Sequence, residues 1–215
     1  MTQNDFNRSI GQFIHEYNSD DRTLRDYSYD FCQVYFRQNE GALLIDNMER
    51  SCYVLWGYLS SFGMLRGSSE LLNRNPSVLS SVISFVAENS FYDIDIDNYS
   101  DVESRRRVIE AYHGIEESLV LVNPSPTLIS KVLLGVYSCV PAFDTFFSNY
   151  LRHNMGFRFR ANRLNDVLLY LYDDFHHIEI PHLYLRQFDG SDSEILIKKV
   201  RFVDRLGWHL GATIQ

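Results

Sequence analysis

Apolar residues recur at helical spacing along most of this chain. Near its start, Phe6, Ile10, Phe13 and Tyr17 fall on one face of a helix, because residues three and four positions apart lie above one another. The same periodicity predicts further helices over residues 24–35, 46–59, 76–86, 100–109, 126–134, 141–150, 164–171 and 191–210. The pattern therefore predicts an all-α or nearly all-α fold with about eight to ten helices.

Capping residues, prolines and glycines mark where these helices are expected to begin and end. The predicted starts are Asp46, the pair Asn75-Pro76, the capping box of Ser100 with Glu103, Pro126, Pro141, and the capping box of Ser191 with Glu194. The predicted ends or bends are Gly63, Gly67, Gly114, Gly135 and Gly211. Short strands are expected only around residues 91–97 or 182–188, where the helical period is lost.

The chain has 215 residues and contains no internal repeat, low-complexity segment or long linker. We therefore expect a single globular helical domain over residues 1–215. Residues 123–126 read Asn-Pro-Ser-Pro, and two prolines this close end one element and start the next. This is the one position where the chain could divide into subdomains.

Composition adds a large aromatic core and an acidic surface to this picture. Hydrophobic residues make up 45% of the chain, which contains 15 Phe and 14 Tyr, so the class of disordered proteins is excluded. The formal net charge is −8, which argues against a protein that is cationic over its whole surface and binds nucleic acid that way. A local basic face stays open.

Signals for targeting, disulfides and cofactors are sparse. Cys32, Cys52 and Cys139 are far apart and form no CxxC pair, so we expect buried apolar thiols rather than disulfides or a zinc site. The N-terminal segment has no apolar signal core, and no stretch approaches the roughly 20 apolar residues of a membrane span. These features predict a cytoplasmic protein without membrane contact. No P-loop, GxGxxG or GxSxG motif occurs, and no cofactor is expected.

Residues 126–144 form the most informative segment for function. A helix from Pro126 carries Lys131, and a tight turn is expected to lead into a second helix from Pro141. Backbone N–H groups in such a turn and at a helix N-terminus bind phosphate. Asp144 would lie in the first turn of the second helix, where the helix dipole favours a carboxylate. The residues expected in the phosphate-binding turn are Gly135, Tyr137 and Ser138.

This segment resembles the helix–hairpin–helix DNA glycosylase superfamily. In that family a hairpin with a Gly-Val element precedes a helix that carries the catalytic aspartate, and bifunctional members use a nearby lysine as a Schiff-base nucleophile. The resemblance implies that Gly135 and Val136 belong to the hairpin, that Asp144 is the acid and that Lys131 is the nucleophile. The alternative is an ordinary connection between two helices, with Asp144 as a helix-start residue.

A second resemblance covers WGYLSSFGMLRGSSELL together with LGVYSCVPAFDTFF. These two segments are similar to a group of uncharacterised bacterial proteins, which implies a bacterial or phage origin but no function. In the first segment, Gly67 and the serines after it favour a polar cap at a helix start, with an anion site as the alternative. A buried Arg66 would need a charged or polar partner there.

Basic residues with interleaved aromatic residues follow residue 150. This segment could hold a phosphate backbone, or it could be surface charge that balances an acidic protein. Its members are Arg152, Arg158, Arg160 and Arg163, with Phe157 and Phe159 between them. A second basic run, residues 105–107, points in several directions on a helix, so at least one of its arginines is expected in a salt bridge or in water.

Three histidines and three acidic residues lie between residues 173 and 182. Asp173 and His177 are four residues apart and could share a metal on one helix face. The spacing matches no known metal motif, however, and histidines near a helix C-terminus interact well with the helix dipole. We therefore assign no metal ligands.

Two functional hypotheses from different classes remain. In the first, the chain is a nucleic-acid-directed protein of helix–hairpin–helix glycosylase type, with Asp144 and Lys131 in one cleft and the arginines of residues 152–163 at its rim. In the second, it is a non-catalytic interaction protein, a subunit of a bacterial complex or a homo-oligomer. An exposed aromatic patch would support the second hypothesis.

Overall fold

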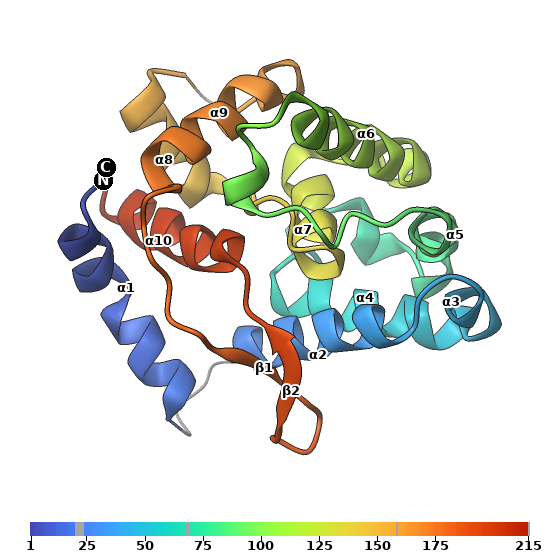
Figure 1. Ribbon diagram of the computed structural model, residues 1–215. Coiled ribbons are helices and arrows are strands. Elements are labelled where there is room, and N and C mark those ends of the chain that lie inside the picture. Colours follow the sequence, from blue (N-terminus) through green and yellow to red (C-terminus); the bar gives the residue numbers. More distant parts are fainter. Residues whose placement is uncertain (20–23, 68, 158, 215) are drawn as a thin grey trace.

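The computed structural model describes residues 1–19, 24–67, 69–157 and 159–214. The structure is 68% helical, with ten α-helices and one short two-stranded antiparallel sheet in the described part of the chain (Figure 1). This confirms the prediction of a nearly all-α fold with short strands. Among these residues, no helix is both long and apolar enough to cross a membrane.

The elements follow one another with mostly short connections. The α-helices are α1 (Gln3–Asn18), α2 (Leu24–Gln38), α3 (Ala42–Asp46), α4 (Met48–Ser61), α5 (Ser80–Glu88), α6 (Val102–Ser118), α7 (Pro126–Val136), α8 (Thr145–Met155), α9 (Leu164–Phe175) and α10 (Lys199–Thr213). The 3₁₀-helices are η1 (Glu70–Asn73), η2 (Pro76–Leu79), η3 (Ile96–Asn98), η4 (Val120–Val122) and η5 (Ala161–Arg163). The strands are β1 (Tyr184–Arg186) and β2 (Asp192–Leu196).

Helix α7 lies at the centre of the molecule (Figure 1). All its side chains from Leu128 to Val136 are buried, and it contacts α2, α4 and α6. A helix that is apolar on nearly every side is stable only when other elements surround it. Buried apolar residues from all ten α-helices join in one core cluster, and the cluster continues across residues 123–126.

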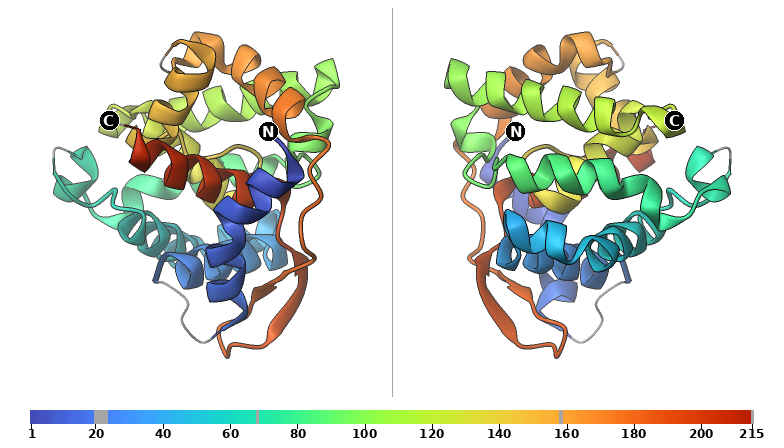
Figure 2. Two further views of the ribbon diagram at one scale, coloured as in Figure 1. Left: turned by 90° about the vertical axis from the view of Figure 1, so that its left-hand side faces the viewer. Right: turned by 90° about the vertical axis from the view of Figure 1, so that its right-hand side faces the viewer.

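Helix α10 packs against α8 and also contacts α1, and Figure 2 shows α1 and α10 side by side. Two glycines of α10 permit the close approach of α8. Gly207 faces the ring of Phe147, and a Cβ at Gly211 would lie 1.8 Å from the carbonyl oxygen of Phe146. The start of α8 is therefore held directly against the backbone of α10.

Several predicted helix boundaries are wrong, and the capping contacts explain why. Asp46 ends the short helix α3, and α4 begins two residues later at Met48. Asp101 caps α6 in place of Ser100, because its carboxylate accepts a hydrogen bond from the backbone N–H of Ser104 at 2.8 Å. Pro141 lies in a buried loop, and α8 begins only after Asp144.

The strand predictions are confirmed at one place and wrong at the other. Strand β1 lies within residues 182–188 and pairs with β2 in an antiparallel hairpin. The predicted capping box of Ser191 with Glu194 is wrong, because this segment pairs as β2 and α10 starts at Lys199. Residues 91–97 form no strand, because Asp95 and Asn98 make the capping box of η3 there.

Glycines play two different roles in the helices. Gly63 and Gly67 follow α4 with positive φ angles, as their predicted role at a helix end requires. Gly114, Gly135 and Gly211 lie inside continuous helices instead, because each gives room to a neighbouring ring or carbonyl group. All three cysteines are buried as free thiols, which confirms their predicted role as small apolar residues.

A substitution at Gly211 tests the packing of α8 against α10. We expect Gly211→Ala to lower the free energy of unfolding by about 2 kcal/mol, because the added methyl group overlaps the Phe146 carbonyl oxygen. Gly57→Ala is the matched control: Gly57 lies inside α4 with no atom within 4 Å of its Cβ position, so helix propensity should raise stability by up to about 1 kcal/mol. Urea denaturation measures both changes, and equal stability of the two variants would contradict this packing.

Candidate functional site

A cleft of about 210 Å³ opens where the α4–η1 loop, α7, the start of α8 and α10 meet. Helix α7 supplies its inner wall, the loop after α4 covers one side, and α10 forms the floor. Charged groups predominate in its lining. The charged residues are Arg25, Arg66, Lys131, Asp144, Arg201, Asp204 and Arg205, and the aromatic ones are Phe62, Phe146 and Trp208.

Lys131 projects from the central helix into this cleft. Its side chain is 7% exposed, and its Nζ donates a hydrogen bond to the backbone carbonyl of Phe62 at 2.6 Å. Burial lowers the pKa of Lys131, and the negative charge of Asp144 partly opposes that shift. Lys131 and Asp144, singled out from the sequence, therefore line one cleft and interact electrostatically.

Asp144 is the N-cap of α8 and is half-buried at the cleft wall. Its Oδ1 accepts hydrogen bonds from the backbone N–H groups of Phe146 and Phe147, at 3.0 and 3.1 Å. Its Oδ2 accepts no hydrogen bond from any residue that the structure describes. One carboxylate oxygen thus holds the helix, and the other remains available to the cleft.

The floor of the cleft is a buried ion network on α10. The guanidinium of Arg201 donates to Asp26 on α2 and to Asp204, both at 2.9 Å. Asp204 also accepts a hydrogen bond from the backbone N–H of Ala142 at 2.9 Å, which ties the α7–α8 loop to α10. Because each of these charges has a partner, the network can persist without solvent.

Three other cations in the cleft are in no salt bridge within the described part of the chain. Arg25, Arg66 and Lys131 form no ion pair with any carboxylate of the described residues. Arg25 lies over the ring of Trp208, with 5.8 Å between its Cζ and the ring centroid. Arg66 lies against Gly63, where a Cβ would come within 2.8 Å of its Nε. Unpaired cations that converge in a hollow attract an anionic ligand.

The turn residues predicted to bind phosphate are not accessible in this structure. Gly135 lies inside α7, and its carbonyl accepts a hydrogen bond from Gln33. The hydroxyl of the buried Tyr137 donates to the carbonyl of Asn89, and Ser138 bonds the hydroxyl of Tyr29. The connection from α7 to α8 is therefore a buried loop that packs into the core, without a hairpin glycine at its turn.

The described residues of the predicted basic rim do not reach the cleft. Arg152, Arg160 and Arg163 are exposed beyond the first turns of α8, and none of them lines the cleft. Arg163 pairs with Asp166 and covers the ring of Phe157 at 4.0 Å. Arg158 lies outside the described residues. In the other basic run, Arg106 and Arg107 form ion pairs as expected, with Glu103, Glu110 and Asp93.

Sequence reasoning missed the residues of α10 that line the cleft. Arg201, Asp204, Arg205 and Trp208 follow helical spacing on α10, which is otherwise buried at most positions. Charges repeated at that spacing within an apolar helix were the available signal. Arg66 was noticed, but it is exposed at the cleft mouth and not buried.

Asp174, His176 and His177 make hydrogen bonds within the protein. Asp174 accepts from Tyr150, Tyr170 and the N-terminal amine, and His177 contacts the carbonyl of Met1. Throughout the described ranges, no three His, Cys, Asp or Glu side chains are grouped so that they could hold a metal ion.

The lowered pKa of Lys131 can be measured directly, because Lys131, Lys198 and Lys199 are the three lysines of the chain. With ¹³C-labelled lysine, we expect the Cε signal of Lys131 to titrate below its ordinary value of 10.5, since burial disfavours the ammonium form. Inorganic phosphate should raise that pKa again by stabilising the charge. Lys198, whose pKa burial lowers to about 8, lies outside the cleft and should not respond. A Lys131 pKa at the ordinary value that does not change when phosphate is added would contradict this description of the site.

Comparison with known proteins gives this chain no relative. It matches no family model, no curated protein and no solved structure. What the cleft can bind has to follow from its own side chains.

Proposed function

We propose that this chain is a nucleic-acid-directed protein that holds a phosphate-bearing nucleotide in the cleft around Lys131 and Asp144. The observation that carries the proposal is a group of three cations in one hollow, Arg25, Arg66 and Lys131, that form no ion pair with a carboxylate of the described residues. A phosphate group offers several acceptor oxygens and enough negative charge to satisfy them together. Phe146 and Trp208 at the same cleft supply aromatic surface for a base.

The acidic charge of the whole chain is compatible with this proposal. Most of the negative charge lies away from the cleft, and a screening length of about 8 Å at physiological salt confines each charge to its own neighbourhood. A ligand at the cleft therefore meets mainly the local cations. The net charge of −8 should weaken association at long range and make binding sensitive to salt.

The finer assignment of catalytic roles rests on the resemblance to helix–hairpin–helix glycosylases. In it, the amine of Lys131 attacks an aldehyde carbon of an abasic sugar, and loss of water forms an imine. The lowered pKa of Lys131 supports this role, because it increases the fraction of neutral, nucleophilic amine. The Oδ2 of Asp144 would accept or donate the proton.

Binding can be tested with a fluorescent duplex that contains an abasic-site analogue, at about 50 and about 200 mM salt. We expect micromolar or tighter binding that weakens steeply with salt. Arg66→Ala should lower the salt slope by about 1, because one phosphate contact is lost. Asp144→Asn should bind more tightly, since it removes a negative charge beside the phosphate while the amide oxygen still caps α8.

Arg50→Ala is the control for this binding experiment, because Arg50 is exposed on α4 and lines no part of the cleft. Its affinity and salt slope should equal those of the unchanged protein. Absence of binding at low salt would refute the nucleic-acid proposal.

The catalytic role has a separate test. If Lys131 forms an imine, borohydride should reduce it to a stable amine and leave a covalent protein–DNA complex on a denaturing gel. Lys131→Arg keeps the positive charge but cannot form the imine, so we expect it to lose at least nine tenths of the trapped product while it still binds. Trapping that persists in Lys131→Arg would assign the chemistry to another amine.

A second candidate function is supported by exposed apolar side chains on the β1–β2 hairpin. Phe188 in the turn is 90% exposed, and Tyr184 and Leu196, which pair on the two strands, are 43% and 46% exposed. Exposed aromatic groups of this kind are typical of contacts with another protein. This candidate predicts that the anisotropy experiment fails while the protein associates with a partner or with itself.

A further inference from the structure

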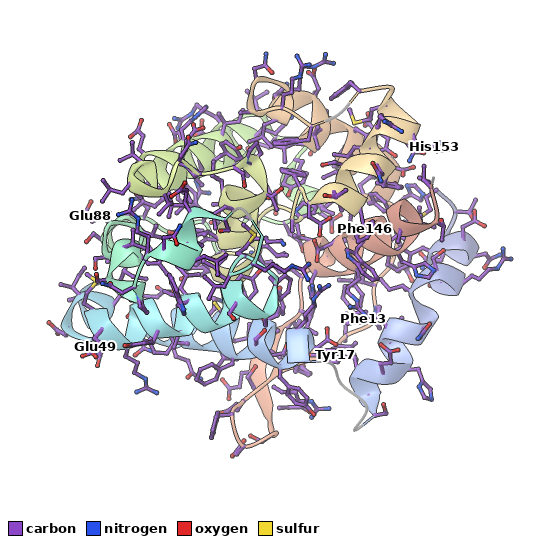
Figure 3. All side chains as sticks on the ribbon, turned by 180° about the vertical axis from the view of Figure 1, so that it is seen from behind. Phe13, Tyr17, Glu49, Glu88, Phe146 and His153 are labelled. Atoms are coloured by element: carbon purple, nitrogen blue, oxygen red, sulfur yellow. The ribbon has the colours of Figure 1, made fainter. Side chains whose placement is uncertain are left out.

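A second hollow adjoins the cleft. It has a volume of about 170 Å³ and lies between α1 and α10. Arg205 and Trp208 line both hollows, so the two are neighbours along the same face of α10. Figure 3 labels Phe146 and Phe13, which mark the cleft side and the α1 side of this face.

The second hollow is lined by Arg8 and by Arg205, which it shares with the cleft. Arg8 is exposed on α1 and forms no ion pair with a carboxylate of the described residues. Arg205 lies over the ring of Phe13, with 5.0 Å between its Cζ and the ring centroid, and makes a long ion pair of 3.6 Å with Glu16. His209 on α10 is exposed at the same hollow. Glu16 offsets one of these charges and leaves Arg8 for an anionic ligand.

Trp208 stands between the two groups of cations. Its ring meets that of Phe146 edge-on, with 5.4 Å between centroids and 82° between planes. Arg25 lies on the cleft side of the indole. Proteins that bind single-stranded nucleic acid use a groove in which cations flank an aromatic side chain. The phosphates contact the cations, and an unpaired base stacks on the ring.

We propose that a single strand of nucleic acid runs from the cleft, over Trp208, into the groove between α1 and α10. This inference rests on the proposed function and specifies its substrate class. One phosphate lies among Arg25, Arg66 and Lys131, a base stacks on Trp208, and a second phosphate lies at Arg8. A fully paired duplex does not fit this arrangement, because its bases already stack on one another and present only their edges. A duplex with an abasic site still fits, because it leaves one base unpaired.

The path is longer than one nucleotide. Helix α10 rises by about 1.5 Å per residue, so the stretch from Arg201 to His209 extends over about 12 Å. A mononucleotide therefore fills the cleft but leaves the groove at Arg8 empty. Affinity should depend on strand length, and the groove should contribute only to longer strands.

The experiment uses the full chain with the Trp56→Phe substitution. The protein has two tryptophans, and this change leaves Trp208 as the only one, so that selective excitation of tryptophan reports on Trp208. The probes are thymidine monophosphate, oligothymidylates of two, four and eight nucleotides, an oligouridylate of eight, and an eight-base-pair duplex, all at low salt. We expect the single strands of four or more to quench Trp208 and to bind at least tenfold more tightly than the monophosphate. The duplex should leave the fluorescence unchanged.

Arg8→Ala in the same background tests the path itself. It should weaken binding of the eight-nucleotide strands at least fivefold and leave the monophosphate unaffected. Arg50→Ala, which lines neither hollow, should change neither. The oligouridylate arm separates DNA from RNA, since both share the phosphate and base chemistry.

The outcomes separate this inference from the proposed function. If the monophosphate and the long strands bind equally and Arg8→Ala has no effect, the path over Trp208 is wrong and the nucleotide cleft stands. If the duplex quenches Trp208 as strongly as the single strands, the single-strand inference is overturned. If no probe binds, both this inference and the proposed function fail.

Discussion

The buried ion network around Arg201 is the interaction on which the rest of the site depends. Arg201 joins α10 to α2 through Asp26, and Asp204 joins α10 to the α7–α8 loop through the backbone of Ala142. Removing Arg201 would take the positive charge away from two buried carboxylates, at a cost of roughly 3–5 kcal/mol. The network thereby sets the positions of three segments that are far apart in sequence but meet at one cleft.

Above this network the balance of charge changes. The carboxylates of the floor pair with Arg201. Arg25, Arg66 and Lys131 face the hollow and form no ion pair with a carboxylate of the described residues. Lys131 illustrates the consequence: burial lowers its pKa, and the carbonyl of Phe62 is a neutral hydrogen-bond acceptor. An anionic ligand would supply the countercharge that the folded chain does not. This local electrostatic demand is the physical basis for the proposed nucleotide site.

Aromatic side chains connect the cleft to the second hollow beside α1. Phe146 is held at the start of α8 by its carbonyl contact with Gly211, and its ring packs edge-on against Trp208. Trp208 in turn lines both the cleft and the groove beside α1. The packing of α10 between α8 and α1 thus joins two separate hollows into one surface, with cations on each side of an indole ring.

Periodicity alone determined the helical class of this protein, because burying one face of each amphipathic helix is a local requirement that Phe6, Ile10 and Phe13 already display. The resemblance of residues 126–144 to helix–hairpin–helix glycosylases singled out Lys131 and Asp144, and the structure places both at one cleft, since only a short loop separates their helices. Only the tertiary structure decided that Gly135 and Ser138 are buried, and that the cations of the cleft come from α2, the α4–η1 loop and α10. Residues so distant in sequence have no shared pattern along the chain. Their meeting depends on how α10 packs against α8 and on which charges the Arg201 network neutralises.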